Sequence, residues 1–331
     1  MNKKKTSKGV TIANVISIVG LVLLLVFTFI GHAYISGGET GWDILVSVGV
    51  TALSALLLWF MIKAKGAENQ LDKWKIAEYA ALGIYIIFAI PASLFGGIMQ
   101  FFVVNDRKAE IKQYATSDLD NIENVFKIYN DSVGKWISVT HSGLRAAVGD
   151  GAERDLSLDR FFTDKGISAN QGGVNKHIEI QRNSFIINRE SSDGIYGIFK
   201  AKRSEIETSV GNWNIIEIPK QAKMLDELAS SVIEKVNEKL GDNKAYFPRV
   251  TQDASSSKYV LGNNQNNGFK IKEISSSLKF KNELSKGGIS ITAIAIVLVI
   301  HLIILFNYIV AHRTHTYRAG MFKEEDGAKA L

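Results

Sequence analysis

Residues 10–30 read VTIANVISIVGLVLLLVFTFI, a run without a single ionisable side chain. A helix needs roughly 20 predominantly apolar residues to cross the hydrocarbon layer of a bilayer. Three further runs meet this requirement, at residues 42–62, 79–104 and 288–310. The sequence therefore predicts an α-helical membrane protein with four transmembrane helices, three of them within residues 1–104.

Lysines and arginines gather beside these runs, but residues 31–41 contain neither. Short loops with excess positive charge stay on the cytoplasmic side during insertion. The N-terminus, residues 63–78 and the tail 311–331 are therefore predicted to be cytoplasmic, and residues 105–287 extracytoplasmic. The cations behind this prediction are Lys3, Lys4, Lys5, Lys8, Lys63, Lys65, Lys73, Lys75, Arg313, Arg318, Lys323 and Lys329.

Charge and cysteine content narrow the class of protein further. The net charge of +6 comes largely from the clusters beside the runs, so residues 105–287 offer no electrostatic footprint for nucleic acid. Cysteine is absent, which excludes disulfides, thiolate metal sites and cysteine nucleophiles. Large extracytoplasmic domains without disulfides are common in bacterial envelopes, and we therefore expect the bacterial cytoplasmic (inner) membrane.

The first run also shares features with a signal peptide, since lysines precede it and the small residues Gly31 and Ala33 follow it. The apolar core of a signal peptide is shorter than this run, at roughly 7–15 residues. Further spans also follow at once. An uncleaved first span is the preferred interpretation, and cleavage would leave the remaining topology unchanged.

Small residues recur four positions apart in the predicted spans. Helices in lipid associate through close backbone approach and side-chain hydrogen bonds, which such stripes permit. We therefore predict packing faces, with a hydrated pore lined by hydroxyls as the alternative. The residues concerned are Ser47, Thr51 and Ala55 in the second span and Ala89, Ser93 and Gly97 in the third.

Pro91 lies in the middle of the third span and lacks a backbone N–H, which predicts a kink. Gly96, beside Gly97, allows further bending about one turn later. Proline and glycine are ordinary in membrane helices, so a static kink is preferred. Pro91 and Gly96 remain the candidates for a hinge.

His301 falls near the middle of the fourth span. A buried imidazole in lipid is costly unless it is paired, so we expect it to face the bundle interior and bond to a neighbouring helix. Tyr308, His312 and His315 follow close to the same face. A proton relay or metal site is the alternative, although histidines at 312 and 315 form an incomplete ligand set. No metal or cofactor is therefore expected.

Two amphipathic helices dominate the predicted extracytoplasmic domain, residues 105–287. Apolar side chains alternate four and three positions apart, which predicts a long stalk helix over about 105–149 that continues from the third span. A second helix is predicted over 220–240, after Pro219 and before Gly241.

Short pieces rich in β-branched and aromatic residues accompany these helices. An Asn-rich turn at 263–268 would join the last two of them as a hairpin. We therefore expect an inserted α/β domain that carries the stalk helix. The pieces that read as strands are residues 177–180, 184–187, 194–199, 259–261 and 269–271.

Sequence motifs give no support for an enzyme. The histidines of this domain, His141 and His177, stand in no nucleophile context. Asp155 and Asp159 are four apart, as are many solvated pairs on helix surfaces. We therefore lean away from catalytic activity.

These observations favour a non-enzymatic, multi-pass subunit of an envelope membrane complex. Its outer domain would bind a partner, while its spans pack with lipid and with other membrane proteins in an oligomer or hetero-complex. One alternative is a ligand-sensing receptor with a separate cytoplasmic partner, because the tail is too short for an output domain. A second alternative is a transport subunit that uses His301.

Overall fold

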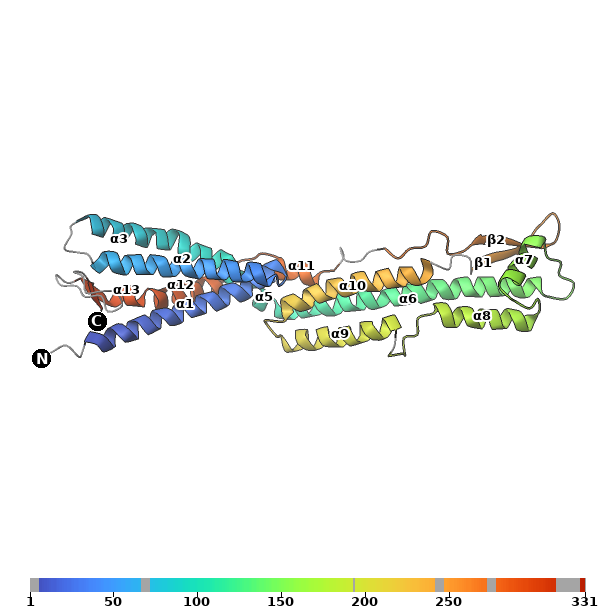
Figure 1. Ribbon diagram of the computed structural model, residues 1–331, viewed down its shortest axis with the longest axis horizontal. Helices are drawn as coiled ribbons and strands as arrows, with labels where there is room; N and C mark the ends of the chain where they lie inside the picture. The colour runs from blue at the N-terminus through green and yellow to red at the C-terminus, as the bar shows by residue number, and fades with distance from the viewer. Residues whose placement is uncertain are drawn as a thin grey trace. The chain divides into compact units, whose positions relative to one another are not determined.

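The computed structural model describes residues 6–66, 72–192, 194–241, 247–272, 278–313 and 328–330. It is mainly helical (Figure 1). The chain forms two compact units. The first comprises Met1–Tyr114, Ser209–Lys223 and Lys279–Leu331, and the second Ala115–Thr208 and Met224–Leu278. The polypeptide thus passes from one unit to the other four times.

Long apolar helices build the first unit. Helices α1 (Thr6–Ser36) and α2 (Thr40–Gly66) are joined by a turn in which Gly37 and Gly38 have φ values of 71° and 85°. The next apolar segment is divided into five elements, of which the two labelled η are π-helical turns. They are α3 (Asp72–Ile84), η2 (Tyr85–Ala89), α4 (Ile90–Ser93), η3 (Leu94–Ile98) and α5 (Met99–Asp106).

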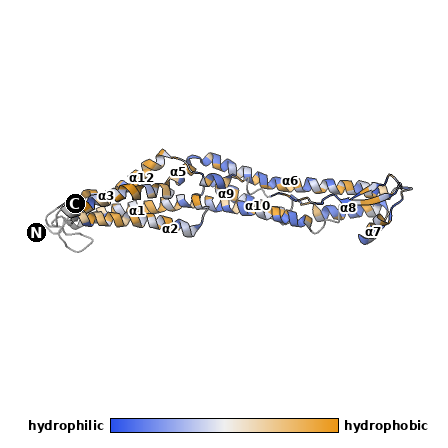
Figure 2. Cartoon of the chain, turned by 90° about the horizontal axis from the view of Figure 1, so that it is seen from above, coloured by the Kyte–Doolittle hydropathy of each residue, from blue (hydrophilic) through white to orange (hydrophobic). Residues whose placement is uncertain are grey.

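Three helices among the described residues are long and apolar enough to cross a membrane: Ile12–Ser36, Thr40–Lys65 and Trp74–Asp106. Large apolar side chains left exposed by the fold lie on these helices and on residues 289–309. The five exceptions in the described part are Ile128, Leu156, Ile180, Ile198 and Ile216. In Figure 2 the helices of the first unit are coloured mostly hydrophobic. Since lipid tails are as apolar as these side chains, the first unit is suited to a bilayer.

The predicted fourth span, residues 288–310, is not one continuous helix. It contains α12 (Ile291–Ile304, 14 residues) and α13 (Phe306–Val310), with a break at Leu305. Just past this break, the N–H of Asn307 donates to Ser17 Oγ of α1 at 3.3 Å. Three helices that could span a membrane are therefore shown, and the fourth span stays a prediction.

Short elements flank this segment. Helix α11 (Phe280–Ser285) precedes it. After α13, β3 (Ala311–Arg313) pairs with β4 (Ala328–Ala330) as an antiparallel two-stranded ladder. The predicted tail 311–331 is thus described only at these two strands.

The predicted stalk helix is present as α6 (Lys108–Ala147). It does not continue unbroken from the third span, because α5 ends at Asp106 and Arg107 leaves helical geometry with φ −100° and ψ 16°. The predicted seam is buried in the second unit, where Ile122, Phe126, Tyr129 and Val133 are fully covered. This agreement confirms the heptad interpretation of the stretch.

The second unit is otherwise helical. Helix α10 (Ile218–Gly241) confirms the prediction for 220–240, and its covered face includes Leu225, Val232 and Val236. The remaining helices are α7 (Leu156–Asp164), α8 (Gln171–Phe185) and α9 (Gly194–Asn212).

Most of the predicted strands are wrong. Residues 177–180 and the start of 184–187 lie in α8, and 194–199 lie in α9. Helical spacing explains the error, because α8 buries Val174, Ile178 and Phe185, whereas Ile180, which a strand would have buried, is 52% exposed. The α/β interpretation is corrected accordingly: a small β-hairpin is the sheet of the described second unit.

The hairpin pairs β1 (Pro248–Gln252) with β2 (Tyr259–Asn264), with a register shift between Pro248 and Val250. The predicted strand at 259–261 is therefore confirmed, but its predicted partner at 269–271 is wrong. Phe269 instead packs edge-on against Trp136 of α6, with ring centroids 4.9 Å apart. Burial of this ring competes with strand pairing.

Candidate functional site

Polar side chains join the apolar segment 72–106 to the segment 280–310 at three levels of the first unit. The first level, which lies between the other two, is centred on His301 of α12. Its Nδ1 lies 2.7 Å from the hydroxyl of Tyr85. Its Nε2 lies 2.8 Å from Ser93 Oγ. All three residues are at most 1% exposed. His301 thus faces the bundle interior and bonds to a neighbouring helix.

Hydrogen positions in this cluster follow from the single proton of each hydroxyl. Ser93 Oγ donates to the carbonyl of Ile90 at 2.7 Å. The Nε2–H of His301 therefore donates to Ser93, and Nδ1 accepts from Tyr85. The cluster is satisfied with a neutral imidazole, and neither ring nitrogen keeps a lone pair for a metal ion. Use of His301 in proton transfer or transport stays a prediction.

Two π-helical turns surround this level. In a regular α-helix the ring of Pro91 would clash with the carbonyl of residue 87, and the wide turn of η2 accommodates it. The second π-turn, η3, contains Gly97 with φ 156° and ψ −36°, a kink that an L side chain rarely adopts. A kink therefore exists at Gly97, within the Gly96-Gly97 pair, whereas the kink predicted at Pro91 is not the one that the structure shows. Movement about the hinge candidates Pro91 and Gly96 stays a prediction.

Gly97 also permits a close approach of α1. A Cβ on Gly31 would lie 1.9 Å from the carbonyl oxygen of Gly97, and one on Gly97 would lie 2.5 Å from the carbonyl oxygen of Thr28. Of the other residues on the predicted packing face, Ala89 is fully buried. The two backbones can touch only because neither glycine carries a side chain.

In α2 the predicted packing residues bond within their own helix. Ser47 Oγ donates to the carbonyl of Asp43 at 2.5 Å, and Thr51 Oγ1 donates to that of Ser47 at 2.8 Å. Ser47 is buried, and Thr51 and Ala55 are half-buried. Their hydroxyls are satisfied locally, and their role as a packing face stays a prediction.

The second level lies at the α13 end of the helix bundle. The hydroxyl of Tyr308 donates to Glu78 Oε1 at 2.7 Å, and Glu78 is only 2% exposed. Lys65 Nζ donates to the carbonyl of Tyr308 at 2.6 Å and lies 4.5 Å from the centre of its ring. A buried carboxylate is thus hydrogen-bonded, with a cation close to its tyrosine partner.

A register links these two levels. Glu78 and Tyr85 are seven residues apart, as are His301 and Tyr308, and the contacts pair Glu78 with Tyr308 and Tyr85 with His301. Seven residues are about two helical turns, so both pairs repeat on one face. From one pair to the next, the residue number rises in the first segment and falls in the second, so the two segments run antiparallel. This spacing was readable from the sequence, but Glu78 and Tyr85 were not singled out there.

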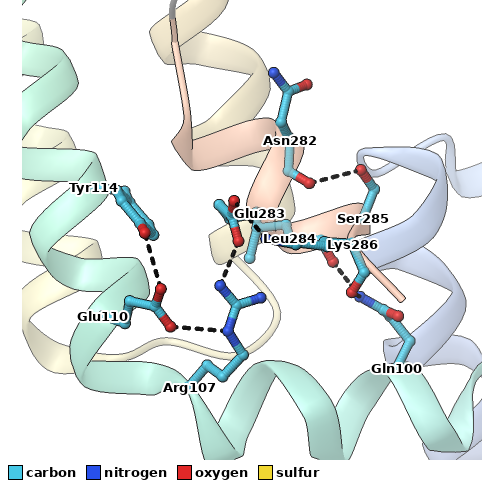
Figure 3. A network of polar contacts seen from close by, with 9 residues as sticks. All are labelled: Gln100, Arg107, Glu110, Tyr114, Asn282, Glu283, Leu284, Ser285 and Lys286. Carbon is cyan, nitrogen blue, oxygen red and sulfur yellow. Dashed lines mark hydrogen bonds and ion pairs between the residues drawn. The ribbon is translucent and has the colours of Figure 1, made fainter. Parts of the chain in front are cut away.

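The third level lies where α5 ends (Figure 3). Arg107 forms ion pairs with Glu110, 2.9 Å from Nε, and with Glu283 of α11. Tyr114 donates to the other oxygen of Glu110 at 2.8 Å. Hydrogen bonding from Arg107 lowers the pKa of Glu283, and Arg107 together with Tyr114 lowers the pKa of Glu110. The carboxylates therefore stay ionised.

Gln100 reinforces this level from inside α5. Its Nε2 donates to the backbone carbonyls of Leu284 and Lys286, the latter at 3.2 Å (Figure 3). Leu284 lies in the last turn of α11 and Lys286 just after it, where no helical donor reaches the carbonyls. The side chains of Gln100 and Arg107 thus bind the segment that immediately precedes α12.

A further buried carboxylate, Asp43, was missed as a site residue. Its Oδ1 accepts from Ser36 Oγ at 2.7 Å and lies 2.8 Å from Nδ1 of His32, and Asp43 is 1% exposed. One signal was available: this is the single acidic residue of the second apolar run, and His32 lies just past the end of the first.

The second unit carries an open groove of about 720 Å³ beside α6 and the C-terminal end of α8. Asn130 fixes one wall by exchanging two hydrogen bonds, each 2.9 Å, with the backbone of Ile187. Arg182 lines the groove and is exposed, and its guanidinium forms no hydrogen bond or ion pair with any described residue. Its other lining residues are Gly134, Ile137, Asn183, Ile186, Asn188, Arg189 and Glu190.

Metal binding has no support in the described ranges, where no group of three or more His, Cys, Asp or Glu side chains is placed to hold an ion. The side chain of His312 and the whole of His315 lie outside the described residues. Contacts of the predicted row beyond Tyr308 are therefore not described. No protein-family model matches the chain, and no curated protein and no solved structure matches it either.

Proposed function

We propose that this chain is a non-enzymatic, four-span subunit of a bacterial inner-membrane complex. In this proposal the second unit is extracytoplasmic and its groove beside α6 binds a partner. The observation that carries the proposal is the unpaired Arg182 in that groove. The membrane-spanning arrangement is argued first, because it decides which compartment the groove faces.

A fourth span is supported by α12 and α13 together. They extend over residues 291–310, which at about 1.5 Å per residue cover about 30 Å. The N–H of Leu305 donates to His301 and that of Ile309 donates to Leu305, both at 2.8 Å, so bonding continues across the break. Exposed apolar side chains at Ile294, Leu298 and Leu302 suit lipid contact.

Topology is supported by the lysine distribution and by an even number of spans, which places both chain ends on one side of the membrane. The chain lacks native cysteine, so single cysteines report the compartment directly. Ser191→Cys should react with a membrane-impermeant maleimide in spheroplasts, whereas Ser7→Cys should react only after lysis. Equal labelling of both before lysis would contradict the arrangement.

The groove suits a partner that presents carboxylates. A guanidinium offers five N–H donors in a planar fork that matches a carboxylate. Arg189, at the same groove, is held by Glu123 and lies over the ring of Tyr196, 5.4 Å from its centre. Arg182 has no such partner, and an acidic group from another protein would complete it.

Partner capture tests this proposal. The full-length protein is cross-linked in cells, extracted in mild detergent, and isolated with whatever is attached. Arg182→Glu should lose the attached protein, and Gly134→Trp should lose it too, because a Cβ at Gly134 meets nothing within 4 Å and the ring would fill the groove. Arg160→Glu, at an exposed arginine without a described partner, is the matched control. A monomer that captures nothing would refute the proposal.

A receptor is the second candidate, favoured by the volume of the same groove. Small-molecule sites occupy roughly 300–1,000 Å³, a range that includes this groove. Melting of the full-length protein is measured with amino acids, organic acids and sugars. A ligand that raises the melting temperature of the unsubstituted protein, but not that of Arg182→Glu, supports the receptor. A captured partner protein without any such ligand supports the subunit.

A further inference from the structure

A second cleft, of about 450 Å³, lies in the first unit where α5 meets α6. One wall comes from Val103, Asp106, Arg107 and Glu110. The opposite wall comes from Lys286, Gly287, Gly288 and Ile289, which lead into α12. The cleft therefore separates two segments that are far apart in sequence.

This cleft has an apolar side and a charged side. Val103 belongs to the long apolar helix that ends at Asp106. Ile289 is 84% exposed, as a side chain in contact with lipid tails would be. The charged side begins at the residue where the apolar helix ends. A molecule in this cleft would thus contact both hydrocarbon and polar surroundings.

The residues that line the charged side carry equal numbers of both signs, and Glu283 beside them pairs with both cations. Asp106 and Glu110 contribute two carboxylates, and Arg107 and Lys286 contribute two cations. The carboxylates stand four residues apart, separated by the break between α5 and α6. The ligand that complements such a surface is a zwitterion with an anionic and a cationic end.

Donors and acceptors remain available after the internal contacts are made. Arg107 uses Nε for Glu110 and one terminal nitrogen for Glu283 (Figure 3), which leaves further N–H groups of its five. Asp106 accepts from Ser290 Oγ through Oδ2 at 2.9 Å. Each carboxylate oxygen can accept more than one hydrogen bond, so an added ammonium group can be bound.

We propose that this cleft binds the phosphoethanolamine headgroup of a bilayer phospholipid. Arg107 and Lys286 bind the phosphate, and Asp106 and Glu110 accept hydrogen bonds from the primary ammonium. The acyl chains then leave along Ile289, which is 84% exposed. Choline binds less well because its quaternary nitrogen has no N–H to donate, and an anionic glycerol headgroup leaves the carboxylates without a counter-charge.

Lipid retention by the full-length protein tests the assignment. The detergent-purified protein is equilibrated with mixed micelles holding equal amounts of phosphatidylethanolamine, phosphatidylcholine and phosphatidylglycerol, and bound lipid is quantified by mass spectrometry. One charge-assisted hydrogen bond corresponds to about a tenfold difference in affinity. The expected result is therefore about tenfold retention of phosphatidylethanolamine over phosphatidylcholine.

Two variants separate the parts of the site. Gly287→Phe fills the cleft without a clash, since a Cβ there meets nothing within 4 Å, and should abolish selective retention. Asp106→Asn removes one ammonium acceptor and should reduce the preference over choline while lipid is still bound. Gly41→Phe, also at a position with open space, is the control and should keep the preference.

Equal retention of the three lipids by the unsubstituted protein would overturn the proposal, as would a preference for phosphatidylglycerol. Unchanged selectivity in Gly287→Phe would overturn the location. If Gly287→Phe fails to fold, Lys286→Gln replaces it, and full selectivity in Lys286→Gln together with Asp106→Asn would be equally fatal. None of these results depends on the groove of the second unit.

Discussion

Gly31→Ala offers a direct test of the contact between α1 and the kinked third span. The new methyl carbon would lie 1.9 Å from the carbonyl oxygen of Gly97 and 2.4 Å from its carbonyl carbon. Even weakly attractive C–H···O contacts need about 3.3 Å between carbon and oxygen. The two backbones must therefore separate by about 1.4 Å, which would loosen the packing around the kink.

The expected loss of stability follows from two opposing effects. Overpacking of this kind costs about 1–3 kcal/mol, whereas alanine in place of glycine within a helix contributes roughly 0.5–1 kcal/mol of stability. Gly31→Ala should therefore lower the free energy of unfolding by about 1 kcal/mol, and by at most about 2.5 kcal/mol. Gly97→Ala should cost more, because the new side chain also meets Thr28 and must adopt a φ of 156°.

Two glycines in the same bundle provide controls. A Cβ at Gly49 of α2 or at Gly83 of α3 meets nothing within 4 Å, so alanine there should leave stability unchanged or slightly raised. Unfolding is followed in detergent micelles by tryptophan fluorescence, with all variants under one condition. If Gly31→Ala proves as stable as Gly49→Ala, the close approach of α1 and η3 is wrong.

The remaining predictions concern charge and hydrogen bonding. His301→Leu removes two hydrogen bonds of roughly 0.6 kcal/mol each in lipid and should lower stability by about 1–2 kcal/mol in the same assay, whereas Val299→Leu, at a half-exposed position, should not. Arg107 lowers the pKa of Glu283 from 4.5, so the unfolded chain takes up a proton at a higher pH than the folded protein does. Stability should therefore fall as the pH drops below about 4.5. In melting curves recorded against pH, Glu283→Gln should flatten that fall. Burial, and then the charge of Lys165, lowers the pKa of His177 from 6.5, so stability should also decline as pH drops below about 6.5, and an equally steep decline in His177→Gln would contradict this.

The three long apolar helices were predictable because the requirement for a span applies to a single stretch of chain. Every backbone group within the bilayer must be satisfied locally, so a run such as 10–30 identifies itself without reference to any other. The stalk helix was predictable for a related reason, since its seam repeats over many turns. The contact of Asn307 with Ser17 beside the break at Leu305 was not, because it joins two different helices.

The wrong strand predictions in the second unit came from segments of only three to six residues. Residues 177–180 contain two isoleucines two apart, as a strand would, but Asn170 caps a helix that starts earlier by accepting from the N–H of Gly173. Considered over fifteen residues, the spacing of Val174, Ile178 and Phe185 is helical. Four-residue windows cannot distinguish the two periods.

For the candidate site, the need for a partner was predictable but the partner was not. The cost of an unpaired imidazole applies wherever His301 lies, whereas the choice of Tyr85 and Ser93 depends on how two helices are rotated and offset. The ion pair of Arg107 with Glu283 joins residues 176 positions apart. No local pattern of charge reports such a contact.

The fourfold passage of the chain between its units has a practical consequence for work with recombinant fragments. A piece cut at the outermost boundaries, 115–278, would include residues 209–223 but not the groups that cover them. Trp213 Nε1 donates to Asn105 at 2.9 Å, and the hydroxyl of Tyr34 reaches the carbonyl of Ile215 at 3.4 Å. Both would be lost, and a mostly buried indole would face water. Such a fragment should aggregate, whereas one with 209–223 replaced by a short polar linker should stay in solution.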